Sequence, residues 1–268
     1  MKPLDCCSGV LVGWGRNREE RHAPDCPQNI EMLALLAEEG IGMVGRKLKA
    51  EEIAVMDIAL DTETGGLDPE IAPILGIDLW HPTGPCFSQR VIGTGRVGRF
   101  GNKMEIHPRA LQANGLNPDE GVPIEEAAKR MVAWWKSIGS PQFHLVGHNV
   151  GPFDVPFLKQ LTHVGVDVPW AMMFDYHYQD TATAAYLMQK DGMLHFGKWS
   201  LTNVCQVLGI LYDPHLSKCD AKASWYANER MSAVRLHYKD MCERGEMCEG
   251  FNETHNIRDH LPALDLRG

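Results

Sequence analysis

The stretch Ile53-Ala-Val-Met-Asp-Ile-Ala-Leu-Asp-Thr-Glu-Thr-Gly-Gly-Leu-Asp-Pro69 decides the fold of this chain. Its apolar residues lead into Asp61 and Glu63, which lie two positions apart, and the run then breaks at Gly65-Gly66. Side chains alternate between the two faces of a strand, so these two acids point the same way. Because like charges on one face repel each other, we expect a divalent metal ion between them.

Length and composition fit one sizeable α/β domain. The chain has 268 residues, and 44% of them are apolar, which is enough for a substantial core. Its formal net charge is −9 and its pI is about 5.7, which excludes the overall basic surface of a bulk nucleic-acid binder. A nucleic-acid enzyme stays open, provided that metal ions supply positive charge locally.

The cysteines and the hydropathy pattern bear on the cell compartment. The eight cysteines are scattered without a regular framework, which indicates reduced thiols. The sequence shows no secretory signal, and no apolar run is long enough to span a membrane. We therefore expect a cytoplasmic protein.

Residues 1–52 differ in composition from the rest and are interpreted as an N-terminal extension of unknown role. Cys6, Cys7, His22 and Cys26 lie there in a Gly- and Arg-rich part. One interpretation is a zinc site of the Cys-Cys-His-Cys type. The other is an arm with free thiols, because the usual Cys-x2-Cys pair is absent.

Strands and helices alternate after the opening strand. Further strands are predicted at 73–80, 86–94, 143–147 and 172–176, and the first two form a meander with the opening strand. Helices are predicted at 107–114, 123–138, 153–161, 180–189, 199–208 and 212–242. Residues 243–268 are expected to form a loose C-terminal tail. The fold class is therefore α/β with a mixed sheet.

Four acids and one histidine can supply metal-assisted chemistry. Asp154 lies at the start of a predicted helix, and Asp220 lies in the last helix. Together with Asp61 and Glu63 they are the four candidate metal ligands. Four carboxylates can hold two Mg²⁺ or Mn²⁺ ions, which prefer oxygen ligands and, about 4 Å apart, clamp a phosphodiester. His215 precedes Asp220 by five residues. On one helix this spacing is about 500° of turn and would put the two side chains on different faces. We therefore expect His215 in the loop before the helix. A histidine there can accept a proton from water.

Several of these residues also have a plainer interpretation. Asp154 can cap a helix N-terminus, and Ser217-x-x-Asp220 matches a capping box. Asp180 is interpreted as the N-cap of its helix, with a supporting role near the metal site as the alternative. His148 is interpreted as support at a strand end.

Together the motifs resemble those of the DnaQ-like 3′–5′ exonucleases of the DEDDh type, within the ribonuclease H-like superfamily. The resemblance covers about residues 53–242. It rests on the Asp-x-Glu of the opening stretch, on Asn149-x3-Phe153-Asp154 and on His215-x4-Asp220-Ala. Many members have two residues between the Asn and the Phe-Asp, whereas this chain has three.

The resemblance implies a mixed five-stranded sheet flanked by helices. It implies a metal-dependent enzyme that hydrolyses phosphodiester bonds at the 3′ ends of single-stranded DNA and releases nucleoside 5′-monophosphates. The four acids would hold two Mg²⁺ or Mn²⁺ ions, and His215 would be the general base. Thr62, Thr64, Leu67 and Asn149 would contact the terminal nucleotide.

Two alternatives differ in substrate or in activity. An exoribonuclease that trims RNA 3′ ends would use the same residues, because recognition of the 2′-hydroxyl depends on the shape of the pocket. A non-catalytic module that binds a partner would keep the fold without the chemistry. Since the sequence shows no polymerase domain, a role in DNA replication or repair would need a separate polymerase or repair partner.

Overall fold

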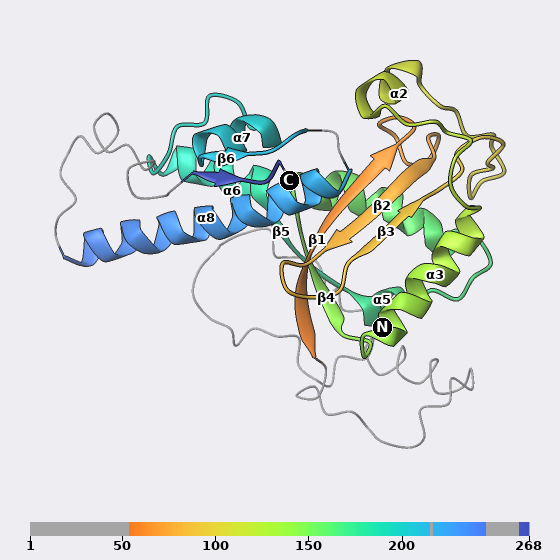
Figure 1. Ribbon diagram of the computed structural model, residues 1–268, viewed down its shortest axis with the longest axis horizontal. Helices are drawn as coiled ribbons and strands as arrows, with labels where there is room; N and C mark the ends of the chain where they lie inside the picture. Colours follow the sequence, from red (N-terminus) through yellow and green to blue (C-terminus); the bar gives the residue numbers. More distant parts are fainter. Residues whose placement is uncertain (1–53, 215–216, 245–262, 268) are drawn as a thin grey trace, which may run out of the picture. The chain divides into compact units, whose positions relative to one another are not determined.

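The structure, a computed structural model, describes residues 54–214, 217–244 and 263–267 (Figure 1). The N-terminal extension and its four candidate zinc ligands lie outside the described residues. Within the described ranges, every helix is too short or too polar to cross a lipid bilayer.

A mixed five-stranded sheet forms the centre of the molecule. Its strands, in the order β3-β2-β1-β4-β5, are β3 (Phe87–Arg90), β2 (Ile74–Trp80), β1 (Val55–Thr64), β4 (Gln142–Gly147) and β5 (Phe174–Asp180). β1 pairs antiparallel with β2 and parallel with β4, while β3 and β5 extend the sheet at its two edges. The predicted α/β class with a mixed five-stranded sheet is confirmed. The first half of β1, residues 55–59, pairs with β4, whereas its carboxyl end, residues 60–64, pairs with β2.

One face of the sheet is covered by α3 (Ile124–Ser137) and by the short helices α4 (Val155–Leu158) and η3 (Lys159–His163). The helix α3 forms because its apolar residues recur at helical spacing and bury one stripe. This layer buries the side chains of β1 that alternate with the acids, together with large residues of the helices: Ile58, Leu60, Met131, Phe157, Leu158 and Leu161.

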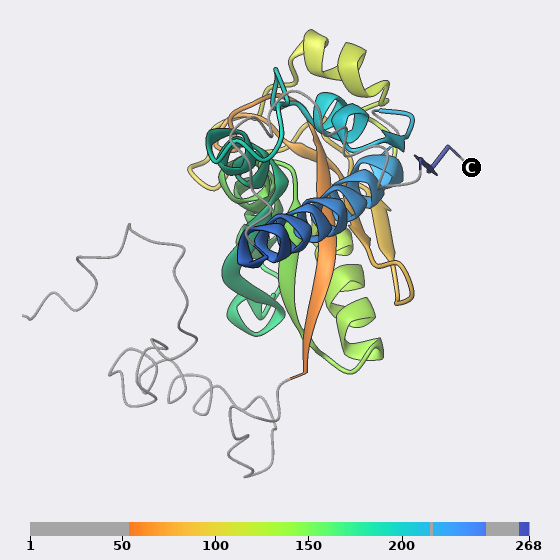
Figure 2. The ribbon, with the colours of Figure 1, turned by 90° about the vertical axis from the view of Figure 1, so that its left-hand side faces the viewer.

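The opposite face is crossed by the long helix α8 (Ser217–Glu243), which packs on β1, β2 and β4 (Figure 2). Trp80 on β2 contacts Trp225 and Tyr226 of α8, with ring centroids 6.2 and 5.7 Å apart. The other side of α8 packs on α6 (Thr181–Lys190) and α7 (Leu201–Val207) and forms a second apolar core. The helix α8 is therefore anchored between the sheet and a helical layer.

The structure differs from the sequence prediction at several boundaries. Met172 and Met173 belong to a helical turn, α5 (Trp170–Met173), and β5 begins only at Phe174. The strand predicted over 86–94 is shorter, since β3 ends at Arg90, and α2 spans Pro108–Asn114.

The expectation of a loose tail is wrong at its end. There β7 (Leu264–Asp265) pairs in parallel with β6 (Ile210–Leu211). Leu266 is buried in the second core, and this burial gives the end of the tail a fixed place.

Candidate active site

Three carboxylates meet at the carboxyl end of β1. Asp61 and Glu63 point to the same face of the sheet, as their spacing requires, and Asp220 approaches from α8. One carboxylate oxygen from each residue lies within 4.8 Å of the other two. Glu63 and Asp220 are each only 9% exposed. This convergence brings together residues 159 positions apart in the chain (61 and 220).

The packing of α8 fixes the position of Asp220. It lies in the first turn of α8, where a negative charge is favourable to the helix dipole. Ala223 and Ala227, one and two turns further along, are completely buried in the second core. Burial and the charge of the nearby Asp220 raise the pKa of the Tyr212 phenol, whose oxygen lies 3.2 Å from the Thr202 hydroxyl. The side chain of Ser217 is not among those that the structure describes, so its part in a capping box stays a prediction.

The fourth acid, Asp154, is fixed by β1. Its Oδ1 accepts hydrogen bonds from the Thr62 backbone N–H at 2.9 Å and from the Thr62 hydroxyl at 2.6 Å. The Asp154 side chain makes no helix-capping hydrogen bond, so the N-cap interpretation is wrong. Asp154 lies outside the group of three converging oxygens, but its charge is close enough to raise the pKa of Asp61.

A π-helix, η2 (Val150–Asp154), leads into Asp154. The Val155 N–H donates to the Val150 carbonyl, which is the i to i−5 bond of a π-helix. A π-turn takes up one more residue than an α-turn, so it accommodates the additional residue between Asn149 and Phe153. The segment is tightly packed, since a Cβ at Gly151 would lie 3.0 Å from the Tyr178 ring.

Burial and mutual repulsion favour protonation of these carboxyls. Burial raises the pKa of Asp61 well above its ordinary value, and the charges of Asp154, Asp220, Glu63 and Asp78 raise it further. Burial and the charge of Asp220 raise the pKa of Glu63 to about 7. Burial likewise raises the pKa of Asp154 to about 7, although its hydrogen bonds lower it. A cation at this place would favour the ionised forms, so its binding would release protons.

A fifth acid, Asp78, belongs to the same cluster and was not selected from the sequence. It lies on β2 directly opposite Asp61 in the antiparallel register and is only 3% exposed. Its charge contributes to the raised pKa values of both Asp61 and Glu63. The register of β1 against β2 would have identified it, but the sequence does not give that register.

Arg90 places a positive charge beside this acidic cluster, and it too was missed. Glu63, Gly76 and Arg90 are register partners across β1, β2 and β3. Because Gly76 has no side chain, Nη1 of Arg90 passes over it. A Cβ there would lie 3.2 Å from Nη1 and 3.2 Å from the Glu63 Cβ. The charge of Arg90 lowers the pKa of Glu63 against the larger effect of burial.

The four residues expected to contact a nucleotide occupy different settings. Thr62 is buried and its hydroxyl bonds to Asp154, while the Thr64 hydroxyl donates to the Gly66 carbonyl at 2.7 Å. Leu67 is 86% exposed on the loop after β1. Asn149 is exposed and has a left-handed backbone, with φ 63°. Their contact with substrate stays a prediction.

Two supporting residues behave as the sequence predicted. Asp180 caps α6 by accepting from Ala182 N–H, and it also accepts from the Asn149 N–H at 3.0 Å. His148 contacts the Thr181 hydroxyl at 3.0 Å and the Trp199 carbonyl at 2.6 Å, and burial lowers its pKa. His215, the expected base, lies outside the described residues.

The donor set fits a hard divalent cation. Asp61, Glu63 and Asp220 offer only carboxylate oxygens, and these are close enough to ligate one ion together. Oxygen-only sites of this kind suit Mg²⁺ or Mn²⁺ rather than a soft metal. The raised pKa values agree with this, because a cation would relieve the repulsion that causes part of them.

No family model and no curated protein matches the sequence. Among solved structures, the fold is similar to E. coli exonuclease I with a dA13 oligonucleotide (TM-score 0.52, 14% identity, 69% of this chain and 42% of that chain). It is similar to the zinc-ion-bound E. coli exonuclease I–single-stranded DNA complex (0.52, 14%, 70% and 41%). The exonuclease I of Methylocaldum szegediense is also similar (0.54, 16%, 67% and 40%). The fold is therefore ribonuclease H-like, and the chain spans less than half the length of these proteins.

Proposed function

We propose that this chain is a metal-dependent nuclease that removes nucleoside 5′-monophosphates from the 3′ ends of single-stranded DNA. One observation supports it above all: carboxylate oxygens of Asp61, Glu63 and Asp220 converge within 4.8 Å at the end of the central strand. The fold is shared with exonuclease I, whose solved complexes contain single-stranded DNA. That similarity supports the choice of nucleic acid as the substrate.

Each acid has a distinct part in this proposal. Asp61, Glu63 and Asp220 would hold Mg²⁺ or Mn²⁺, and Asp154 would complete the set for a second ion. When bound, two such ions stabilise negative charge on the attacking and leaving oxygens of a phosphodiester. The β1 and α8 backbones keep the carboxylates in place before substrate arrives, so little reorganisation is needed.

Proton transfer is assigned to His215, following the resemblance of the sequence to the DEDDh exonucleases. His215 would accept the proton of the attacking water, a role that contributes about 10²- to 10⁴-fold to a rate. The His215→Ala variant should lose activity by that factor and still bind Mg²⁺. Loss of Mg²⁺ binding in this variant would show that His215 is a ligand and that the base assignment is wrong.

The direction and the substrate are tested together with labelled oligonucleotides. The purified chain is incubated with matched single-stranded DNA and RNA labelled at either the 5′ or the 3′ end, in Mg²⁺ and in EDTA. A 5′-labelled DNA strand should shorten stepwise, and the 3′ label should appear at once as a mononucleotide. Both reactions should stop in EDTA.

Isosteric variants connect the activity to the site. Asp61→Asn and Asp220→Asn should abolish Mg²⁺-dependent release, whereas Asp167→Asn, which changes an exposed loop carboxylate, should not. Release by both site variants at the wild-type rate would disprove the proposal. Faster degradation of RNA than DNA would assign the exoribonuclease alternative to the same centre.

A further inference from the structure

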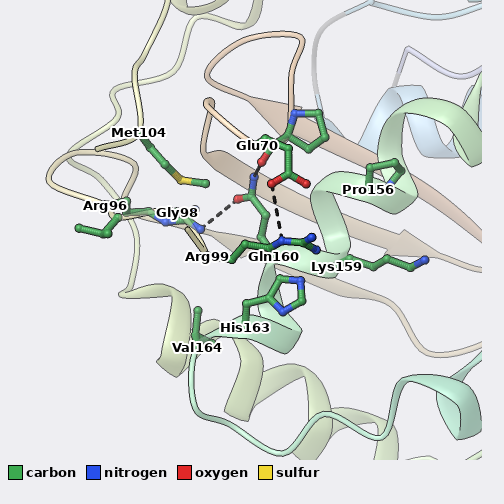
Figure 3. A pocket seen from close by; sticks show the side chains of 12 residues that line it. Glu70, Arg96, Gly98, Arg99, Met104, Pro156, Lys159, Gln160, His163 and Val164 are labelled. Carbon is green, nitrogen blue, oxygen red and sulfur yellow. Dashed lines mark hydrogen bonds and ion pairs between the residues drawn. The ribbon is translucent and has the colours of Figure 1, made fainter. Parts of the chain in front are cut away.

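A pocket of about 240 Å³ lies beside the loop that follows β1 (Figure 3). Its polar lining residues are Glu70, Arg96, Arg99, Lys159, Gln160 and His163. Glu70 follows Leu67 by three residues, a distance of at most about 11 Å along the chain. The pocket is therefore a close neighbour of the proposed nucleotide site but contains none of its carboxylates.

The charge of the pocket is opposite to that of the chain. The chain carries a formal charge of −9. The pocket is lined by the cations Arg96, Arg99 and Lys159, against a single acid, Glu70. The ion pair between Arg99 Nε and the Glu70 carboxylate is long, at 3.7 Å, and both side chains are about half exposed. A pocket with this balance attracts an anion.

Arg96, one of the lining residues, is held in place by two hydrogen bonds. Its guanidinium donates to the Ile74 carbonyl at 3.1 Å and to the Gln160 Oε1 at 3.0 Å. Burial lowers the pKa of Arg96 to about 10, so the group is still charged at neutral pH. A fixed, partly desolvated guanidinium loses little side-chain entropy when it binds an anion.

Gln160 connects the pocket to the loop after β1. It is 7% exposed, and its Nε2 donates to the carbonyls of Pro69 and Ala72, both at 2.8 Å. Its Oε1 accepts from the Ile74 N–H at 3.0 Å as well as from Arg96. These four bonds mean that the loop bearing Leu67 and the wall of the pocket form one rigid unit.

We propose that this pocket binds a backbone phosphate of the strand whose 3′ end lies in the carboxylate centre. The inference rests on the proposed nuclease function. Phosphate is the anion that a nucleic-acid strand offers at regular intervals, and arginine matches its geometry. Beside the pocket, the Arg99 guanidinium lies 4.4 Å from the ring centroid of Phe100, which is 68% exposed and offers a face on which a base can stack.

The experiment measures binding without hydrolysis. Fluorescence anisotropy follows a 5′-labelled single-stranded oligonucleotide added to the whole chain in EDTA, over a series of salt concentrations. Replacing Arg99→Gln and Lys159→Gln together should weaken binding about 3- to 10-fold. It should also reduce the slope of log affinity against log salt by about 0.7, the value for one phosphate of a single strand that is no longer neutralised. Glu70→Gln should tighten binding.

The matched control replaces two exposed lysines of α3, Lys129→Gln and Lys136→Gln, and should leave affinity and slope within twofold of wild type. Equal affinity and slope in the pocket double variant and this control would overturn the inference. A pocket variant that loses only the binding of an acidic peptide would also overturn it, in favour of a protein partner. If the pocket double variant binds DNA as tightly as the wild type and the wild type degrades 3′ ends, only the assignment of the pocket as a phosphate site is refuted. Pocket-dependent binding without Mg²⁺-dependent hydrolysis refutes the nuclease proposal instead.

Discussion

Raising the pH of the metal-free protein from 5 to 8 should lower its stability, and Mg²⁺ should restore it. The cause is the carboxylate centre, where burial raises the pKa of Glu63 from 4.5 to about 7. Between these two values the folded chain keeps a proton that the unfolded chain has lost. The folded state is therefore penalised progressively as pH rises from 4.5, and the full penalty is reached above pH 7.

The magnitude follows from the pKa change. Each pKa unit is worth about 1.36 kcal/mol, so Glu63 contributes about 3 kcal/mol, and Asp154, also raised to about 7, adds to it. For a domain of this size, 1 kcal/mol corresponds to about 2–4 °C in Tm. Glu63 alone should therefore lower Tm by about 6–12 °C across this range.

Two other groups must be separated from this effect. Burial lowers the pKa of His148, so its contribution to stability is lost as pH falls through about 6.5 and opposes the carboxylates. Burial tends to raise the pKa of Asp175, but hydrogen bonds from His177 lower it on balance. The stability from Asp175 is lost only as pH falls below 4, outside the range tested.

The assay is thermal denaturation at pH 5, 6, 7 and 8, in EDTA and in MgCl₂, for the wild type and the isosteric double variant Asp61→Asn/Glu63→Gln. The quantity compared is the Tm of the wild type minus that of the variant at each pH, which cancels the histidine effect. This difference should fall with pH in EDTA and rise with pH in MgCl₂. A difference that stays constant from pH 5 to 8 in both buffers would refute the reasoning.

Three further predictions concern individual side chains. Thr62→Val should lower kcat about 10-fold or more, measured by nucleotide release, because Asp154 loses the hydroxyl that positions it. Arg90→Gln should raise the titration midpoint of Glu63, measured by NMR of ¹³C-labelled glutamate in EDTA, because the charge of Arg90 lowers that pKa. Phe157→Ala should destabilise the fold by about 3–5 kcal/mol in urea denaturation, because the ring is completely buried.

Each of these has a control and an opposite outcome. Thr62→Ser keeps the hydroxyl and should keep most of the rate, and equal loss in both variants would indicate disturbed packing instead. An unchanged Glu63 midpoint in the Arg90 variant would mean that the guanidinium is too distant to act. Phe100→Ala, at a ring that is 68% exposed, should change stability by less than about 0.5 kcal/mol.

The sequence predicted the sheet because the chain uses strong local signals. The apolar run that leads into Asp61 and the turn around 82–84 predict an opening strand followed by a meander, and both are present. The sequence did not predict the secondary structure of Met172-Met173-Phe174 correctly. Three apolar residues satisfy either a helical turn or a strand, and packing decides for α5 followed by β5.

The candidate site was predictable where a residue's neighbours along the chain determine its direction. Asp61 and Glu63 follow from the period of a strand. Asp78 and Arg90 depend on cross-strand register, which the sequence leaves open, and were found only in the structure. The closeness of Tyr212 to Asp220 likewise depends on the packing of α7 and β6 against α8.

The central claim is that the carboxylates at the end of β1 hold the metal ions of a nuclease. Anomalous diffraction from crystals soaked in Mn²⁺ with a nucleoside 5′-monophosphate measures this directly. We expect two manganese peaks about 4 Å apart within reach of Asp61, Glu63 and Asp220, with the phosphate beside them. Peaks elsewhere on the molecule, or no peak within reach of Asp61, Glu63 and Asp220, would contradict the claim.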